Sequence, residues 1–197
     1  MELKSVCVFC GSRMGARPEY LEGAKALGAE LARRGITLVY GGTTVGLMGA
    51  MADAALAGGG KVVGILPRVL SDREIAHPGL TELHLVDSMH TRKAMMAERA
   101  EAFIAMPGGI GTFEELFEVT TWAQLGIHHK PIGLLNVANY YAPLLAMMKR
   151  AVDEGFIAEA SAQPFACDPS PASLLETLQK AGQPLSPATP RLSPEQT

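Results

Sequence analysis

The sequence has little of several features that mark particular classes of protein. Its three cysteines are too few, and odd in number, for a disulfide framework. Basic residues are not in excess, because the formal net charge is -3, so nothing indicates a nucleic-acid partner. No stretch approaches the roughly 20 apolar residues of a membrane helix, and the first residues show no signal-peptide pattern. We therefore expect a cytoplasmic protein that binds a small molecule and no membrane.

The cysteines and histidines also give little support for a metal site. Cys7 and Cys10 have the spacing of some zinc and redox motifs, but they lie in an extended apolar run. Residues three apart in a strand face opposite sides of the sheet, so these thiols are expected to pack in the core. The pair His128 and His129 precedes Lys130 in a predicted surface loop, and no grouping has zinc-ligand spacing. We expect no metal.

Apolar runs of strand length alternate with segments of helical periodicity along most of the chain. The predicted strands are residues 5–11, 37–40, 61–66, 82–86, 102–105, 131–136 and 165–167. The predicted helices are residues 18–34, a small-residue helix ending near 56, residues 89–100, a helix ending at 126, and residues 140–153 and 171–180. This alternation predicts an α/β protein, a single-domain Rossmann-like three-layer sandwich with a parallel sheet flanked by helices, over residues 1–182.

Two segments lack this alternation. Pro67 is expected to end the third strand, and residues 68–81 lose any period, which predicts a long loop of functional or mobile character. Residues 183–197 hold four of the 13 prolines and almost no apolar side chain, so we predict a disordered tail.

The segment from Met106 to Glu115 is the centre of the predicted chemistry. It reads MPGGIGTFEE between a buried strand and a helix. Its three glycines are expected to allow positive φ and to leave the backbone open to a ligand. The unpaired N–H groups of a helix start favour an anion, most often a phosphate. Two further glycine turns, at residues 11–13 and 41–49, also follow strands, and all three should meet at the carboxyl edge of the sheet.

None of these turns matches a dinucleotide or nucleoside-triphosphate fingerprint. Gly109 and Gly111 are followed by a glutamate where a dinucleotide loop has its third glycine, and the 41–49 turn lacks the Gly-Lys-Ser/Thr ending that binds triphosphates. The sequence therefore favours a single phosphate over a pyrophosphate.

Thr112 and Glu115 allow two interpretations. Thr-x-x-Glu at a helix start is the pattern of a capping box, which is a purely structural role. Alternatively, Glu115 faces the ligand on the glycine loop. At the positive end of a helix its pKa should be lowered, so it would be an ionised carboxylate and a poor general acid.

Arg92 and Lys93 occupy the first turn of the helix that Ser88 is expected to cap. The helix dipole disfavours cations there by about 0.3–1 kcal/mol each, so another interaction should hold them. A solvated pair on a polar face is the simpler alternative. Against it, Arg92 shares one helical stripe with Met95, Met96 and Arg99.

These motifs together resemble one known family. The stretch PGGIGTFEE at residues 107–115 matches a PGGxGTxxE signature, and with SMHTRK at 88–93 and VGLMG at 45–49 the chain resembles the Lonely Guy family from about residue 5 to 182. Its members, often mislabelled lysine decarboxylases, cleave the N-glycosidic bond of cytokinin riboside 5'-monophosphates or AMP to give the free base and ribose 5-phosphate. The resemblance implies such a hydrolase, with a purine nucleoside 5'-monophosphate as substrate, no cofactor, and a homodimer whose sites lie near the interface, beside Met95 and Met96.

The resemblance also assigns residues to the site. Arg92 and Glu115 take the catalytic positions. The implied substrate contacts are Glu74, Arg92, Lys93, Gly108, Gly109, Ile110, Gly111, Thr112, Phe113, Glu114, Glu115 and Thr121, with additional loop contacts at Gly11, Ser12, Gly42, Gly46 and Met48. The chain departs from the family pattern at Thr43, commonly glycine, and at Ile110, usually tyrosine. Neither departure removes an ionisable group, but both bear on substrate preference.

The sequence also bears on two other functions. A decarboxylase is disfavoured because no cofactor-binding constellation is visible and no lysine stands out for a Schiff base. A non-catalytic nucleotide or molybdenum-cofactor carrier on the same fold is the stronger alternative, because fold does not decide function. A carrier would not need the pair of Arg92 and Glu115, so this pair favours the hydrolase.

Overall fold

The computed structural model describes residues 2–71, 76–161 and 163–181. The predicted disordered tail, residues 183–197, and the implied contact Glu74 lie outside the described residues, and so does the end of the predicted domain at 182. No helix in the described ranges is long and apolar enough to cross a membrane.

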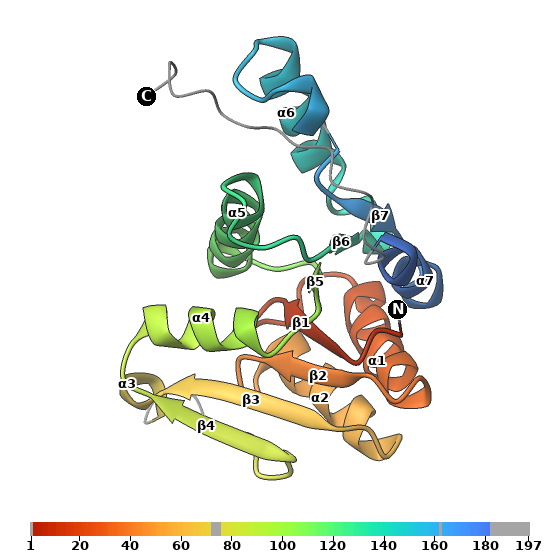
Figure 1. Ribbon diagram of the computed structural model, residues 1–197. Coiled ribbons are helices and arrows are strands. Elements are labelled where there is room, and N and C mark those ends of the chain that lie inside the picture. The colour runs from red at the N-terminus through yellow and green to blue at the C-terminus, as the bar shows by residue number, and fades with distance from the viewer. Residues whose placement is uncertain (1, 72–75, 162, 182–197) are drawn as a thin grey trace.

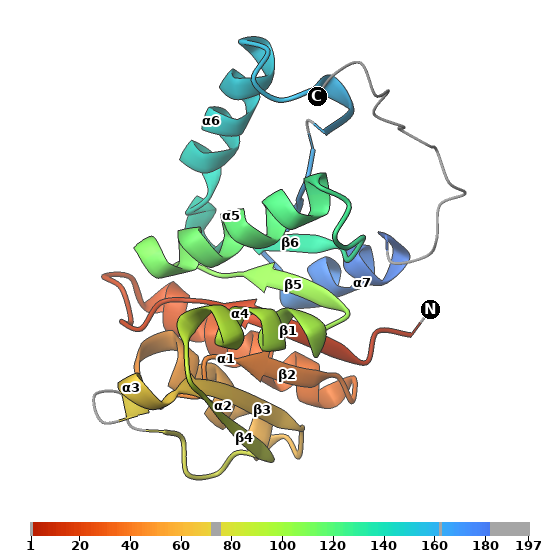
Figure 2. The ribbon, with the colours of Figure 1, turned by 60° about the vertical axis from the view of Figure 1, so that its left-hand side comes forward.

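The α/β prediction is confirmed. Seven parallel strands form one sheet in the order β4-β3-β2-β1-β5-β6-β7, with helices on both faces (Figures 1 and 2). The strands are β1 (Ser5–Phe9), β2 (Thr37–Tyr40), β3 (Val62–Pro67), β4 (Glu82–Val86), β5 (Ala102–Ala105), β6 (Ile132–Leu135) and β7 (Ala166–Asp168). The helices are α1 (Pro18–Arg33), α2 (Gly46–Ala57), α3 (Arg68–Ser71), α4 (Met89–Glu98), α5 (Ile110–Gln124), α6 (Ala142–Asp153) and α7 (Pro171–Ala181), with short 3-10 turns η1 (Val137–Asn139) and η2 (Glu159–Ser161).

Two apolar layers hold the helices against the sheet. One contains β1 side chains such as Val6 and Val8 together with α1, α2 and α7. The other contains Cys7 and packs against α4, α5 and the start of α6. Cys7 and Cys10 fall in different layers, which confirms that they face opposite sides of the sheet. Among the described residues no group of three or more His, Cys, Asp or Glu side chains could hold a metal ion.

Two local predictions need correction. The third strand does end at Pro67, but it includes this residue, which is paired with Val86 of β4. The strand tolerates it because β2 accompanies β3 only as far as Gly64, so the ladder on that side has already ended. The predicted loop after Pro67 begins instead with the one-turn helix α3.

The order of the strands fixes the position of the site. From β1 to β4 each successive strand is added on one side of β1, and from β5 to β7 each successive strand is added on the other side. The direction in which strands are added therefore reverses between β1 and β5. In open parallel sheets the crevice at such a reversal, at the carboxyl ends of the strands, is the usual place for a ligand. The turns after β1 and β5 flank this crevice.

Candidate active site

Three turns meet at this edge, as the sequence predicts, and main-chain hydrogen bonds join them. Gly11, in the turn after β1, donates its N–H to the carbonyl of Pro107 after β5 (3.1 Å) and accepts the N–H of Leu47 at the start of α2 (3.0 Å). Gly46 has a φ of +58°, and a Cβ on it would lie 2.3 Å from the carbonyl carbon of Ser12. The turns therefore approach too closely for a side chain at this position.

The glycine loop after β5 differs from its prediction in one respect. None of Gly108, Gly109 and Gly111 has positive φ. Their small size matters instead. A Cβ on Gly108 would lie 2.1 Å from Thr112 Oγ1, so a side chain would clash there, whereas Gly109 and Gly111 face open space. Gly109 is the N-cap of α5, so the amides from Gly109 to Thr112 have no partner within the helix. The amides are thus available to a ligand, and anion binding there stays a prediction.

The capping-box interpretation of Thr112 and Glu115 is wrong. Because α5 begins at Ile110, Thr112 lies inside the first turn, where it is buried, and not at the N-cap. The sequence pattern misleads here because a glycine, which carries no side-chain signal, caps the helix.

Arg92 and Glu115 are brought together from two helices. Ser88 caps α4 by accepting the N–H of Thr91 (3.0 Å), which confirms the predicted start of this helix. Arg92 is only 8% exposed. Its Nε donates to the carbonyl of Ile65 (3.1 Å) and its Nη1 to Glu115 Oε1 (3.3 Å). A solvated Arg92 is thus excluded.

Gly41 provides the space for this guanidinium. A Cβ on Gly41 would lie 2.2 Å from Arg92 Nη2 and 3.2 Å from Met48 Sδ. The glycine turn after β2 is therefore part of the Arg92 site, although sequence reasoning did not single out Gly41.

Glu115 has a pKa opposite to the prediction. Burial raises its pKa from 4.5 to about 7, although Arg92 acts in the other direction. The sequence placed the carboxyl at the positive end of a helix but did not show that it would be buried beside Arg92 of α4. Near neutral pH this carboxyl can gain or lose a proton, which suits general acid or base chemistry.

Lys93 is also held by partners and is not solvated. Its Nζ donates to Glu114 and to Glu118 Oε1 (3.0 Å), and its side chain is 10% exposed. Burial lowers the pKa of Lys93, but the hydrogen bonds that its ammonium donates to Glu114 and Glu118 raise it more, so the pKa lies above its usual value. Thr121 is exposed on α5 and its hydroxyl donates to the carbonyl of Phe117 (2.7 Å), so no described contact joins it to Arg92 or Glu115.

A cavity of about 470 Å³ lies beside the glycine loop. Its lining comprises Gly11, Ser12, Arg13, Met14, Gly15, Tyr20, Leu47, Pro107, Gly108, Gly109, Ile110 and Tyr140. Five residues expected at the site, namely Gly11, Ser12, Gly108, Gly109 and Ile110, thus border one cavity. Arg92 and Glu115 are not among its lining residues.

Three further expected contacts, Met48, Gly42 and Phe113, do not line this cavity, and the predicted interface residue Met96 is buried. Met48 is buried, with its sulfur 3.9 Å from Thr43 Oγ1. Gly42 has a φ of +82°, and its carbonyl accepts the N–H of His77 (3.0 Å). Phe113 is partly buried and stacks on Tyr140. Met96 is 1% exposed and packs in the core of this chain, so it offers no surface to a second copy.

Sequence reasoning missed two tyrosines. The hydroxyl of Tyr140 donates to the carbonyl of Gly108, and that of Tyr141 to the carbonyl of Met106 (2.6 Å). The adjacent pair was visible, but the periodicity assigned Tyr140 to a helix, which in fact begins at Ala142.

Known proteins resemble this chain in sequence and in fold. A family described as "possible lysine decarboxylase" matches residues 48–178. A cytokinin riboside 5'-monophosphate phosphoribohydrolase of Arabidopsis thaliana is 51% identical over 177 residues, which cover 90% of this chain and 82% of that protein. A probable enzyme of the same name from Oryza sativa subsp. japonica is 50% identical over 177 residues, 90% of this chain and 72% of that protein.

Solved structures extend the resemblance to the fold. The molybdenum cofactor carrier protein of Chlamydomonas reinhardtii has a TM-score of 0.68 at 18% identity, over 91% of this chain and 98% of that one. The molybdenum cofactor binding protein of Rippkaea orientalis has a TM-score of 0.66 at 24% identity, again over 91% and 98%. At these identities the likeness concerns the fold alone. The matching family and the relatives at about half identity show that the chain belongs to the Lonely Guy family, that of the cytokinin riboside 5'-monophosphate phosphoribohydrolases.

Proposed function

We propose that this protein hydrolyses the N-glycosidic bond of a cytokinin riboside 5'-monophosphate or AMP and releases the free base and ribose 5-phosphate. The observation that carries the proposal is the buried pair of Arg92 and Glu115 beside the glycine loop. The names of relatives at about 50% identity support the same activity.

The reaction breaks the bond between C1' of the ribose and a nitrogen of the base. Positive charge builds on the sugar as this bond lengthens, as in other glycoside hydrolyses. In its ionised form Glu115 would stabilise this charge and accept a proton from the attacking water. Oxygen from water then joins C1', and the base departs with the bonding electrons and takes up one proton, which balances the proton that water gave to Glu115. Fixed charges of this kind typically contribute about 10²–10³ in rate.

Arg92 is suited to hold Glu115 and the substrate in place. Its hydrogen bond to the carbonyl of Ile65 fixes the guanidinium, and its second bond orients the carboxylate. A guanidinium keeps its charge at any physiological pH, so it can also stabilise negative charge that develops on the departing base.

The 5'-phosphate would be bound by the amides from Gly109 to Thr112, with Ser12 across the cavity. Lys93 of α4 and, on α5, Glu114 and Thr121 are further proposed contacts; Thr121 shares a face of α5 with Glu114 at a spacing of seven residues. We further propose a cytoplasmic homodimer with its sites near the interface. Light scattering at micromolar concentration tests the dimer, and a monomer would count against it.

The function is tested by incubating the protein with AMP, prenylated AMP and adenosine and separating any free base by chromatography. The expected result is base release from one or both monophosphates and not from adenosine, with Glu115→Gln inactive. Equal rates on adenosine and AMP would contradict the phosphate anchor. Binding of AMP without release of base would favour the carrier. The buried carboxylate of Glu115, which binding alone does not require, would then lack a catalytic role.

A further inference from the structure

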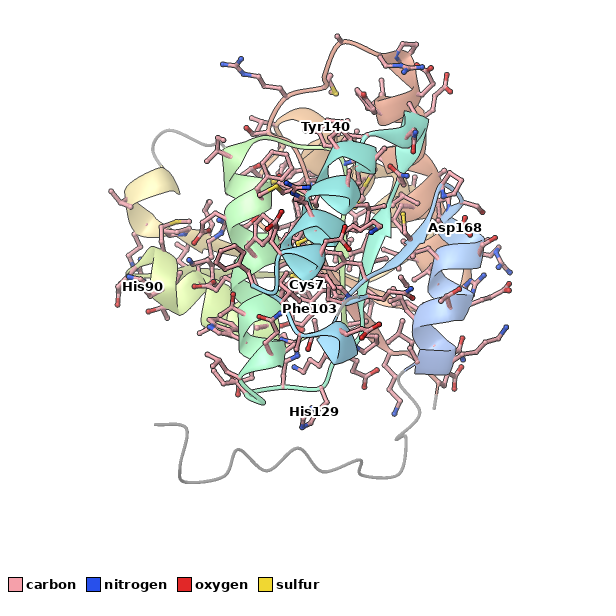
Figure 3. The ribbon with its side chains drawn as sticks, turned by 90° about the horizontal axis from the view of Figure 1, so that it is seen from above. Cys7, His90, Phe103, His129, Tyr140 and Asp168 are labelled. Atoms are coloured by element: carbon pink, nitrogen blue, oxygen red, sulfur yellow. The ribbon has the colours of Figure 1, made fainter. Side chains whose placement is uncertain are left out.

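The hydroxyls of Tyr140 and Tyr141 reach the same segment of main chain. Tyr141 donates to the carbonyl of Met106, where the chain leaves β5, and Tyr140 donates to the carbonyl of Gly108, one residue before the N-cap of α5. Figure 3 shows Tyr140 at the end of the molecule where α5 begins, opposite His129, which follows the end of α5. Two neighbouring side chains thus hold alternate carbonyls of the glycine loop.

The turn that presents these tyrosines is strained. Ala138 and Asn139 have φ values of 51° and 59°, the left-handed region that residues with a side chain rarely occupy. Asn136 stabilises the turn, because its Oδ1 accepts the N–H of Tyr141 (2.7 Å) and its Nδ2 donates to Asn139 Oδ1 (3.1 Å). Strain of this kind persists where the surroundings require one conformation. Here the strained turn places the hydroxyls of Tyr140 and Tyr141 on the glycine loop after β5.

The two hydrogen bonds have different consequences for a ligand. A peptide unit is planar, so fixing the carbonyl of one residue also fixes the N–H of the next residue on the opposite side. The bond from Tyr140 therefore fixes the direction of the Gly109 N–H and polarises it. The bond from Tyr141 fixes the peptide of Pro107, which has no N–H to direct.

The ring of Tyr140 is held independently of its hydroxyl. It stacks on Phe113 at a centroid distance of 6.4 Å and meets Tyr20 and Tyr141 edge-on at 5.8 and 5.1 Å. Removing the hydroxyl alone should leave this ring in place. Tyr141 differs because it is fully buried, and burial raises its pKa well above the usual value, so its hydroxyl remains a donor.

We propose that Tyr140 is a positioning residue for the phosphate group of the substrate. Its hydroxyl orients the peptide between Gly108 and Gly109 so that the Gly109 N–H donates to the anion. This inference rests on the proposed function for the identity of the anion, a 5'-phosphate. Tyr141 holds the same loop for stability but directs no donor at the ligand.

The test compares Tyr140→Phe with the matched variant Tyr141→Phe. For Tyr140→Phe we expect a rise of about tenfold or more in KM for AMP and in the inhibition constant of inorganic phosphate, with kcat changed less than about threefold and an unchanged Tm. For Tyr141→Phe we expect a lowered Tm, because a buried carbonyl loses its partner, and values of KM within about threefold of wild type. Tyr140→Phe with wild-type KM and phosphate inhibition, or equal changes of KM in both variants, would overturn the proposal.

A second measurement uses the wild-type protein and does not depend on turnover. In a ¹⁵N–¹H NMR titration with inorganic phosphate, the amide proton of Gly109 should shift downfield as it donates to the anion. A wild-type protein that shifts Gly109 but releases no base from AMP would remove the proposed function and retain the role of Tyr140. Base release without any shift of Gly109 would remove the role of Tyr140 and retain the function.

Discussion

Replacing Glu115 with glutamine is expected to stabilise the protein above neutral pH while it removes activity. Glutamine resembles the protonated carboxylic acid in size and hydrogen bonding but cannot ionise. Burial raises the pKa of Glu115 from 4.5 to about 7, so ionisation of this group opposes folding. The gap between these two pKa values corresponds to roughly 3 kcal/mol once the group is ionised in both the folded and the unfolded chain.

The sign of the effect follows from proton binding. Below about pH 4.5 the carboxyl is protonated in both states and contributes nothing to the difference. Between about pH 4.5 and 7 the folded protein binds the proton more tightly than the unfolded chain, so wild-type stability falls as pH rises. Glu115→Gln avoids this loss, and its advantage should grow from about 1 kcal/mol at pH 5 to about 3 kcal/mol at pH 8.

Urea unfolding of both proteins from pH 5 to 8 measures this advantage. At pH 8 the corresponding rise in Tm is on the order of 6–12 °C for a domain of this size. Glu114→Gln is the matched comparison: its side chain is half exposed and its charge helps to raise the pKa of Glu115, so its replacement should reduce the pH dependence of wild type only in part. A stability difference between Glu115→Gln and wild type that stays constant from pH 5 to 8 would refute the raised pKa.

Three further outcomes are expected. On AMP, kcat/KM should rise with pH through about 7, because burial places the ionisation of Glu115 there and the ionised form is the one proposed to act; a pH–rate profile that is flat across this range would contradict that role. Gly41→Ala introduces a Cβ 2.2 Å from Arg92 Nη2 and should lower kcat by about 10²-fold without unfolding, as checked by circular dichroism, whereas a wild-type rate would show that the guanidinium can move freely. Arg92→Lys keeps the charge but cannot hydrogen-bond both Ile65 and Glu115, so kcat should again fall by about 10²-fold. Full activity of this variant would show that only the positive charge of Arg92 is needed.

Local patterns in the sequence predicted most of the fold because the spacing of apolar residues reports which segments form helices and which form strands. The alternation of apolar runs and helical periods identified the parallel sheet, and Ser88 identified the start of α4. The opposite orientation of Cys7 and Cys10 follows from strand geometry alone. The convergence of three glycine turns at one edge also follows, because parallel strands end on the same side.

The properties that were not predictable depend on which elements pack together. The pKa of Glu115 depends on its burial in the folded protein, and the helix dipole alone gave the wrong direction. The start of α5 at Ile110 depends on Gly109, a cap without a side chain. The contacts of Gly41 with Arg92 and of Tyr140 with Gly108 join residues 51 and 32 positions apart, which no periodic pattern reveals.

The main-chain bonds that join Gly11 to Pro107 and Leu47 have a consequence for how this site can evolve. Because the proposed anion anchor is built from main-chain amides, substitution of rim side chains that do not hold the glycine loop should leave it intact. Ile110, which is 82% exposed at the rim of the cavity, can change without disturbing these bonds. Under the proposed function, retention of the phosphate would be separated from choice of the base, and new substrates would be reached by varying the rim while the glycines and Tyr140 stay constant.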